Sequence, residues 1–416
     1  MACTGQIRVM RSLYVLCSLA TLAVPVALRA EPLTLQRGLN FDIWIDWQSV
    51  DHMLATDGFL SPFPDWQKII TDEQLAQVRA DGFDFVRLPM DPGPLLALGP
   101  GAARAAQISD IRMGTERALA AGLNVVVDLH AFPRPEEPWG TDDVVGRLWP
   151  NHLALVAEVG RALNGLPPDR VAFEPLNEPT NDCDAVWGDA PAVWPDMLQD
   201  MHQAARAAAP DLPIVLSGAC WGGVHGLEMI DPAMIGDQNV IWSFHSYDPF
   251  PFSHQGANWT DAPLKYITGL PYPPSALTPE VALQRAAEAA LRMEQAEGQA
   301  DAAAIAATIA QYLAMPDTTV KEEVARATAW ADRHGVPRQR LLLGEFGALR
   351  IGFGQEHPVE WQAAFLADKR ASAEIHGVAW AVWNWAGDMG VAILDDPSRR
   401  MDPRLCTALA LAGCSE

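Results

Sequence analysis

The sequence predicts an α/β fold, a (β/α)8 TIM barrel with a long, partly helical insertion after the sixth strand. Short apolar runs alternate with segments of helical periodicity, which is typical of parallel strands that are buried on both faces. Eight such runs occur in a chain of 416 residues, of which 49% are hydrophobic, so one closed barrel can use most of the chain. A doubly wound open sheet is the alternative, but no Gly-rich phosphate loop follows the first strand.

The predicted strands and helices follow one another in the order that a barrel requires. The strands are mostly continuous apolar runs, at 35–41, 83–88, 124–129, 171–176, 214–217, 240–244, 340–344 and 378–383. Helical periodicity is present between them, for example at 73–81, 108–121, 153–164, 195–209 and 320–334. Alternation of this kind predicts helices that connect neighbouring parallel strands.

One segment, at about 248–318, departs from this alternation. The segment from Tyr247 to Lys321 has far more residues than a usual connection between a strand and a helix. The first part of the segment is rich in Pro, Gly and aromatic residues, whereas residues 279–313 are Ala-rich and predict two helices. The insertion could form a lid or a wall of a substrate cleft, or a helical hairpin with no role in binding, and the sequence favours neither.

The N-terminus has the pattern of a secretory signal peptide, which we place at residues 1–30. Arg8 and Arg11 precede an apolar run, and Ala30 offers a small residue for cleavage. The run contains Pro25 and is short for a membrane span, so an uncleaved anchor is the competing interpretation. We therefore predict one domain at 31–416 that is secreted to the periplasm or beyond, without stable membrane association after cleavage.

Four cysteines remain after residues 1–30, and an even number suits an oxidising compartment. Three pairings of Cys183, Cys220, Cys406 and Cys414 are possible. We favour Cys406 with Cys414, because these two are close in sequence, and therefore Cys183 with Cys220. No CxxC spacing occurs, so we expect no zinc site, and nothing in the sequence calls for a cofactor.

The charge balance limits the choice of partners. The chain has 52 acidic and 29 basic residues, a net charge of −23. Nucleic acids and anionic membrane surfaces repel such a chain, so we expect neither as a partner. Acidity also keeps a secreted protein soluble, and it does not oppose a neutral ligand. We expect a monomer.

Polar and titratable residues stand at the C-terminal ends of six predicted strands, where barrel enzymes place their catalytic groups. Each has a structural explanation when taken alone: Arg87 as an ion-pair partner, or His130 as a buried histidine bonded to Asp128. Their joint placement on one rim is hard to explain as packing. The six ends are Arg87-Leu88-Pro89, Asp128-Leu129-His130, Asn177-Glu178-Pro179, His245-Ser246-Tyr247, Gly344-Glu345-Phe346-Gly347 and Trp383-Asn384-Trp385.

These motifs resemble those of glycoside hydrolase family 5, the cellulase-like family, and they occur in the same order. The resemblance runs from near Asn40 to near Gly390. Asn177-Glu178-Pro179 resembles the acid/base motif of the family, and Glu345 stands where its nucleophile would be. The resemblance implies a glycoside hydrolase that cleaves β-linked polysaccharide with retention, by double displacement. Its other active-site positions are matched by Arg87, His130, Asn177, His245, Tyr247 and Trp383.

The chemistry of retention agrees with these roles. It needs two carboxyl groups about 5–5.5 Å apart, and carboxylates that end the fourth and seventh strands face each other across a barrel mouth. Glu178 must hold a proton near neutral pH, so we expect its surroundings to raise its pKa, whereas Glu345 must be ionised. By resemblance, Arg87 and the Tyr247 hydroxyl stabilise the nucleophile, and Asn177 bonds the sugar 2-hydroxyl.

The remaining matched residues and several tryptophans fit a sugar cleft. His130 and His245 would bond sugar hydroxyls or orient the carboxylates, and the Trp383 ring would lie under the sugar. Indole rings stack on the apolar faces of pyranoses, although a tryptophan is as often simply half-buried. Trp44 and Trp221 are the two further tryptophans that we expect to bind substrate. The others considered are Trp47, Trp139, Trp149 and Trp259.

The sequence leaves several functions open. An endo-β-1,4-glucanase comes first, and the same machinery could act on mannan, on β-1,3-glucan or on an exopolysaccharide. A catalytically silent carbohydrate-binding protein belongs to another class, but both carboxylates are present. A metal-dependent hydrolase is a further alternative, and the absence of a His-x-His pair disfavours it.

Overall fold

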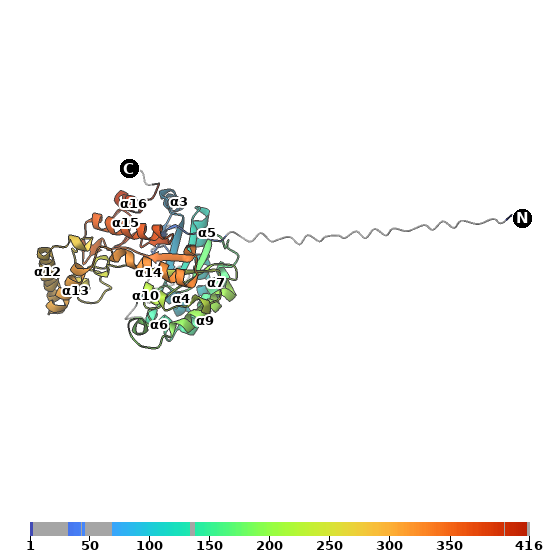
Figure 1. Ribbon diagram of the computed structural model, residues 1–416, viewed down its shortest axis with the longest axis horizontal. Coiled ribbons are helices and arrows are strands. Elements are labelled where there is room, and N and C mark those ends of the chain that lie inside the picture. The colour runs from blue at the N-terminus through green and yellow to red at the C-terminus, as the bar shows by residue number, and fades with distance from the viewer. Residues whose placement is uncertain (3–31, 43, 46–68, 134–137, 395, 414–416) are drawn as a thin grey trace. The chain divides into compact units, whose positions relative to one another are not determined.

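The structure is a computed structural model, and it describes residues 1–2, 32–42, 44–45, 69–133, 138–394 and 396–413. Between residues 32 and 413 a closed barrel of eight parallel strands is surrounded by helices (Figure 1). The predicted (β/α)8 barrel is therefore confirmed. Almost all of the predicted signal peptide lies outside the described residues, and it stays a prediction.

The order of the strands around the barrel follows their order along the chain, and the last strand closes onto the first. All neighbouring barrel strands pair in parallel, and each predicted strand corresponds to an observed one. The strands are β1 (Arg37–Asn40), β2 (Phe85–Met90), β3 (Asn124–Leu129), β4 (Val171–Glu174), β5 (Ile214–Ser217), β6 (Val240–His245), β7 (Leu341–Glu345) and β10 (Ala379–Val382). A separate two-stranded sheet contains β8 (Ile351–Gly352) and β9 (Gln355–Glu356).

Helices connect the barrel strands, and the five predicted ones are all present. The helix predicted at 108–121 begins earlier, at Ala102, because the residues before Ile108 are good helix formers without an apolar period. The helices before β6 are α3 (Asp72–Asp81), α4 (Pro92–Leu98), α5 (Ala102–Ala120), α6 (Thr141–Val145), α7 (Trp149–Leu163), α8 (Cys183–Trp187), α9 (Trp194–Ala208) and α10 (Val224–Glu228). After β6 come α11 (Phe250–Ser253), α12 (Pro279–Glu297), α13 (Ala302–Ala314), α14 (Thr319–His334), α15 (Val359–Ile375) and α16 (Pro403–Ala408).

The strands read as continuous apolar runs because both of their faces are buried. Val125 and Val127 belong to the larger core, whereas Val126 belongs to a small cluster with Phe85 and Ala172, which fills the inside of the barrel. Side chains two residues apart on a strand share a face. Two positions further along the strands, the inward side chains are Arg87, Asp128 and Glu174, so the barrel interior changes from apolar to polar toward the C-terminal strand ends.

The segment between β6 and α14 contains the two helices that the sequence predicts at 279–313, here α12 and α13. They pack on each other and on the preceding chain: the Tyr312 hydroxyl donates to the Pro271 carbonyl at 2.6 Å, and the Tyr266 hydroxyl donates to Glu297 at 2.6 Å. Within the described residues, no helix has both the length and the apolar character to span a membrane.

Candidate active site

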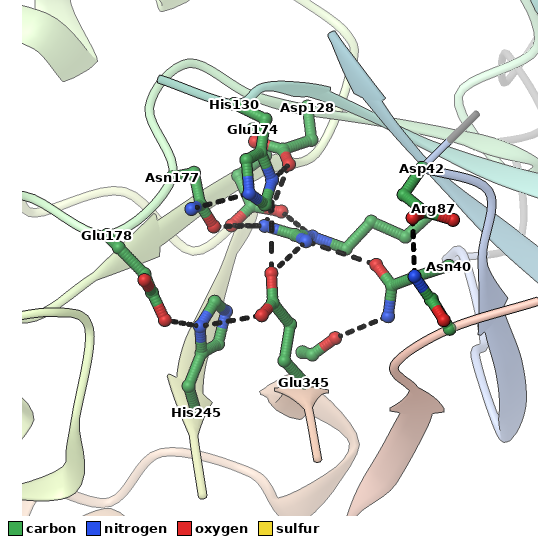
Figure 2. Close-up of polar contacts among 12 residues, drawn as sticks. Asn40, Asp42, Arg87, Asp128, His130, Glu174, Asn177, Glu178, His245 and Glu345 are labelled. Atoms are coloured by element: carbon green, nitrogen blue, oxygen red, sulfur yellow. Dashed lines mark hydrogen bonds and ion pairs between the residues drawn. The ribbon is translucent and has the colours of Figure 1, made fainter. Parts of the chain in front are cut away.

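Arg87 is the centre of a buried polar cluster at the C-terminal end of the barrel (Figure 2). Its guanidinium is fully buried and forms ion pairs with three carboxylates. The nitrogen–oxygen distances are 2.9 Å to Asp128, 2.7 Å to Glu174 and 2.7 Å to Glu345. Burial alone would lower the pKa of Arg87, but the three carboxylates raise it above its usual value, so the residue is a fixed cation.

The strand register brings these partners together. Asn40 on β1 lies opposite Arg87 on β2, and Asp128 on β3 lies opposite Glu174 on β4. Arg87 also donates to the Asn40 side-chain oxygen at 3.1 Å, and the Asn40 amide nitrogen donates to the Gly344 carbonyl at 3.0 Å. These bonds join β1, β2 and β7 just below the end of β7, where Glu345 stands.

Glu345 is almost completely buried, with 5% of its side chain exposed, and its carboxylate is held by donors on both oxygens. Oε1 accepts from Arg87, and Oε2 accepts from the Tyr247 hydroxyl at 2.8 Å. Burial and the neighbouring Glu345 raise the pKa of Tyr247, so its hydroxyl keeps its proton and donates. A cation and a neutral donor together stabilise the ionised carboxylate.

Glu178 lies after the end of β4 and keeps 22% of its side chain exposed. His245 Nδ1 is 2.6 Å from its Oε1 and 3.5 Å from Glu345 Oε2, so this ring lies between the two carboxyl groups. Carboxylate oxygens of Glu178 and Glu345 lie within 4.8 Å of each other. Burial, supported by the charge of Glu174, raises the pKa of Glu178 to about 8, with Arg87 opposing the shift.

A second chain of bonds orients His130 and Asn177. Asn177 accepts from Arg87 through Oδ1 at 2.7 Å, which directs its amide nitrogen to His130 Nε2 at 3.1 Å. His130 Nδ1 is 2.8 Å from Asp128. Burial lowers the pKa of His130 to about 3, so the ring is neutral, donates to Asp128 and accepts from Asn177. The Trp383 ring stacks on His130, with 5.2 Å between the ring centres.

Trp221 stands in the loop after β5, next to the loop that carries Glu178. Trp221 is 44% exposed, and the following Gly222 lies against Glu178: a Cβ added there would be 3.6 Å from Glu178 Cγ. Backbone bonds from Trp221 and Cys220 to the Glu178 loop, and the predicted Cys183–Cys220 disulfide, tie the two loops together. The other favoured pair includes Cys414, which lies outside the described residues, so that pairing stays a prediction.

Trp44 is a correction. We expected it to bind substrate, but its side chain is fully buried, against Phe41 and beneath the guanidinium of Arg117. A ring with no exposed surface offers no face to a sugar, so Trp44 belongs to the core and not to the candidate cleft. Its neighbour Trp47 lies outside the described residues.

Three polar residues of the site do not end a predicted strand, and the motifs at the strand ends do not include them. Glu174 lies inside the predicted strand at 171–176, and a carboxylate within an apolar run is a signal that could identify it. Asn40 lies inside the predicted strand at 35–41, and it is the last residue of β1 in the structure. Asp42 is paired with the Asn384 amide beside Trp383, and burial raises the pKa of Asp42 to about 7.

The trio Glu178, His245 and Glu345 has the composition of a metal site, with one potential ligand atom from each within 4.8 Å. Both oxygens of Glu345, however, already accept hydrogen bonds. The Arg87 guanidinium at 2.7 Å would also repel a divalent cation. The donor set therefore suits a carboxyl pair that exchanges a proton better than it suits a metal ion.

Comparisons with known proteins identify the family of the chain. The family model of cellulase, glycosyl hydrolase family 5, matches residues 48–388. Endoglucanase 3 of Fibrobacter succinogenes is 23% identical over 86% of this chain, which spans half of that protein's length. Endoglucanase C of Acetivibrio thermocellus is 22% identical, over 90% of this chain and 97% of its own.

Solved structures have the same fold. Cel5A of Thermotoga maritima, in complex with cellobiose, superposes with a TM-score of 0.62 at 21% identity, over 90% of this chain and 97% of its own. The cellulose synthase subunit Z of Clostridioides difficile gives a TM-score of 0.61 at 18% identity, over 90% and 99%. Because the family model covers most of the sequence, the chain belongs to glycosyl hydrolase family 5 and is a glycoside hydrolase.

Proposed function

We propose that the protein hydrolyses a β-linked glucan with retention, with Glu345 as the nucleophile and Glu178 as the acid/base. The observation that carries this proposal is the approach of their carboxylate oxygens to within 4.8 Å. Retaining enzymes place the two carboxyl groups about 5–5.5 Å apart, whereas inverting enzymes need about 6.5–9.5 Å to admit a water molecule.

The reaction has two displacements. Glu345 attacks the anomeric carbon while Glu178 protonates the departing glycosidic oxygen, which forms a glycosyl ester and releases one part of the chain. Glu178, now ionised, then takes a proton from water, and the water oxygen displaces Glu345 from the sugar. Both groups return to their starting protonation states.

The surrounding side chains support these steps. Arg87 and Tyr247 stabilise the Glu345 carboxylate when the ester breaks. Asn177 donates one amide hydrogen to His130, and the other amide hydrogen can be donated to the sugar 2-hydroxyl. We place the Trp383 ring beneath the sugar at the point of cleavage, with His130 stacked behind it. His245 lies between the two carboxyl groups and orients Glu178.

The glycan is the least constrained part of the proposal, and an endo-β-1,4-glucanase is our first choice. Relatives of similar length are named endoglucanases, and a structure of Thermotoga maritima Cel5A contains cellobiose. Another structure of that protein contains mannotriose, so a mannan is the main alternative, with β-1,3-glucan or exopolysaccharide behind it. We propose that exposed Trp221 stacks on a sugar next to Glu178.

We also propose that the segment at 248–318 shapes one side of the cleft, since it begins directly after Tyr247. Phe250 is 43% exposed and stacks on His254, whose ring in turn meets the Tyr247 ring edge-on. Deletion of residues 279–313 should change the distribution of oligosaccharide products or raise KM. An unchanged product profile would support a hairpin with no role in binding.

Secretion and the monomeric state complete the proposal. The Cys183–Cys220 disulfide suits an oxidising compartment, in agreement with a signal peptide at 1–30. N-terminal sequencing of the exported protein would locate the cleavage site. Light scattering would test the monomer.

The function is tested by a panel of soluble β-glucans and mannans, with analysis of the products. We expect the wild-type protein to release oligosaccharides from at least one β-1,4-glucan, and the isosteric Glu345→Gln variant to release none. Activity in EDTA should equal activity without it, because the reaction uses no metal. Equal, undetectable hydrolysis by both proteins on every glycan would instead favour a carbohydrate-binding protein.

A further inference from the structure

A buried network of Ser246, Glu323 and Lys369 joins the end of β6 to two helices. Ser246 follows His245, whereas Glu323 comes from α14 and Lys369 from α15. Ser246 and Lys369 are completely buried, and Glu323 keeps 13% of its side chain exposed. None of the three reaches the sugar in the proposed reaction, so the mechanism described so far leaves the network unexplained.

The network holds the chain on both sides of Tyr247. The Lys369 ammonium donates to the Ser246 hydroxyl at 2.6 Å and to the Asp248 carbonyl at 3.0 Å. The Ser246 hydroxyl donates to Glu323 at 2.5 Å, and the same carboxylate oxygen accepts from the Asp248 backbone nitrogen at 3.4 Å. Tyr247 is thus the residue between two anchored neighbours.

Regular strand pairing does not provide this anchorage. The pairing of β6 with β7 shifts register between Phe244 and His245, so the ladder is irregular just before the segment that carries Tyr247. One backbone bond, from the Ser246 nitrogen to the Glu345 carbonyl at 3.0 Å, still connects the strands beyond this point. Ser246 therefore links the strand of the nucleophile with the buried network through its backbone and its hydroxyl.

The composition of the network indicates a role in geometry more than in stability. A buried ammonium is costly unless it is paired and fully hydrogen-bonded, and an apolar cluster of similar volume often stabilises a fold at least as well. Charged and hydrogen-bonded groups instead fix the relative position of the segments that they join, because each hydrogen bond has a preferred distance and angle. The bonds here fix the two peptide units that flank Tyr247.

We propose that Ser246, Glu323 and Lys369 are positioning residues for the hydrolytic reaction, which hold Tyr247 so that its hydroxyl meets Glu345. The network acts through Tyr247 and touches no substrate. This inference rests on the proposed role of Glu345 as the nucleophile. The proposal predicts that loss of the network lowers kcat only while the Tyr247 hydroxyl is present.

A double-mutant cycle tests this dependence. Ser246→Ala removes the hydroxyl shared by Lys369 and Glu323, and kcat and KM on an aryl β-cellobioside are measured with Tyr247 and with Tyr247→Phe. We expect Ser246→Ala to lower kcat about tenfold with little change in KM when Tyr247 is intact, and less than about twofold in the Tyr247→Phe background. Ser372→Ala is the matched control, since it deletes a buried hydroxyl from α15 outside the network.

Three results would contradict the proposal. Equal losses of kcat in the two backgrounds would show a general structural effect. An unchanged kcat in Ser246→Ala would show that the network does not position Tyr247. If Tyr247→Phe alone left kcat unchanged, the proposed role of Tyr247 at Glu345 would fail together with the inference. Should Ser246→Ala fold poorly by circular dichroism, Lys369→Met combined with Glu323→Gln removes both charges together and enters the same cycle, with the same outcomes.

Discussion

The ends of β4 and β7 present the same functional group in different surroundings. Glu345 has 5% of its side chain exposed, an ion pair with Arg87 and a hydrogen bond from Tyr247. Glu178 is more exposed, at 22%, and in the part of the chain that the structure describes its hydrogen-bonding side-chain partner is His245. The two carboxyl groups therefore differ in their hydrogen-bonding neighbours as well as in their exposure.

Two physical effects produce this difference. A guanidinium and a hydroxyl that both donate to a carboxylate favour its ionised form. Burial beside a neutral ring favours the protonated form, and burial lowers the pKa of His245, which leaves that ring neutral near pH 7. The pKa of Glu178 accordingly rises to about 8. The raised pKa of Glu178 supports its proposed role as the acid.

Removal of Glu345 should have the largest effect. Glu345→Ala should lower kcat by about 10⁵-fold or more, because the covalent intermediate cannot form. Added azide should then restore activity by attacking the anomeric carbon from the vacated side, and the glycosyl azide should have inverted configuration. Rescue with retained configuration would contradict the role of Glu345.

Removal of Glu178 should have a smaller effect that depends on the leaving group. Glu178→Ala should lower kcat/KM by about 10²–10⁴-fold on a polysaccharide, since proton transfer contributes about that much. An aryl glycoside with an acidic phenol needs no proton, so its first step should be nearly unaffected. Azide should speed the second step and give a retained product. Equal losses on both substrates would exclude Glu178 as the acid.

The pH dependence tests the same difference without mutation. Because Glu178 must be protonated to act as the acid and its pKa is about 8, kcat/KM on a polysaccharide should fall as pH rises above about 8. The slope should approach tenfold per pH unit. With an activated aryl glycoside this alkaline loss should vanish, and its persistence there would assign it to another group.

Tyr247→Phe removes one of the two donors to Glu345. A hydrogen bond to a charged group is worth about 1.5–3 kcal/mol, so kcat should fall by about 10- to 100-fold. The fold should be retained, because the ring still packs against His254. Steady-state kinetics with a thermal melt separate the two effects, and a large loss of melting temperature would argue for a structural role instead.

The two tryptophans singled out in the sequence should respond in opposite ways. Trp221→Ala should raise KM by about two- to tenfold at little cost in stability, since it removes an exposed stacking surface. Trp44→Ala should destabilise the fold by about 3–5 kcal/mol and leave KM of the folded protein unchanged. Chemical denaturation and kinetics on both variants check this. A raised KM in Trp44→Ala would indicate that Trp44 contributes to substrate binding and would contradict its assignment to the core.

The sequence predicts the barrel and most of the rim for one physical reason. A polar residue near the end of a predicted apolar run is conspicuous, and Arg87, Glu178 and Glu345 are all of this kind, although Arg87 lies within β2 in the structure. Glu174 is not among the predicted site residues, because it lies inside an apolar run and not at its end. Trp44 was misread because an indole suits a core and a sugar cleft equally, and only three-dimensional packing separates these cases.

Contacts between segments that are distant along the chain could not be predicted from the sequence, for a different reason. The network of Ser246, Glu323 and Lys369 joins a strand end to two helices that lie 77 and 123 residues further along the chain. Each residue alone is an ordinary serine, glutamate or lysine, and the helical pattern does not distinguish a buried charge from a solvated one. The Cys183–Cys220 pairing, by contrast, was one of three that the four cysteines allow, and it was favoured because Cys406 and Cys414 are close in sequence.

The most direct test is the configuration of the sugar released by the wild-type enzyme. Proton NMR during hydrolysis of a β-linked oligosaccharide records the first anomer before mutarotation. Carboxylate oxygens within 4.8 Å of each other predict that the β anomer appears first, by net retention. Initial appearance of the α anomer would show inversion, and it would contradict the assignment of Glu345 as the nucleophile.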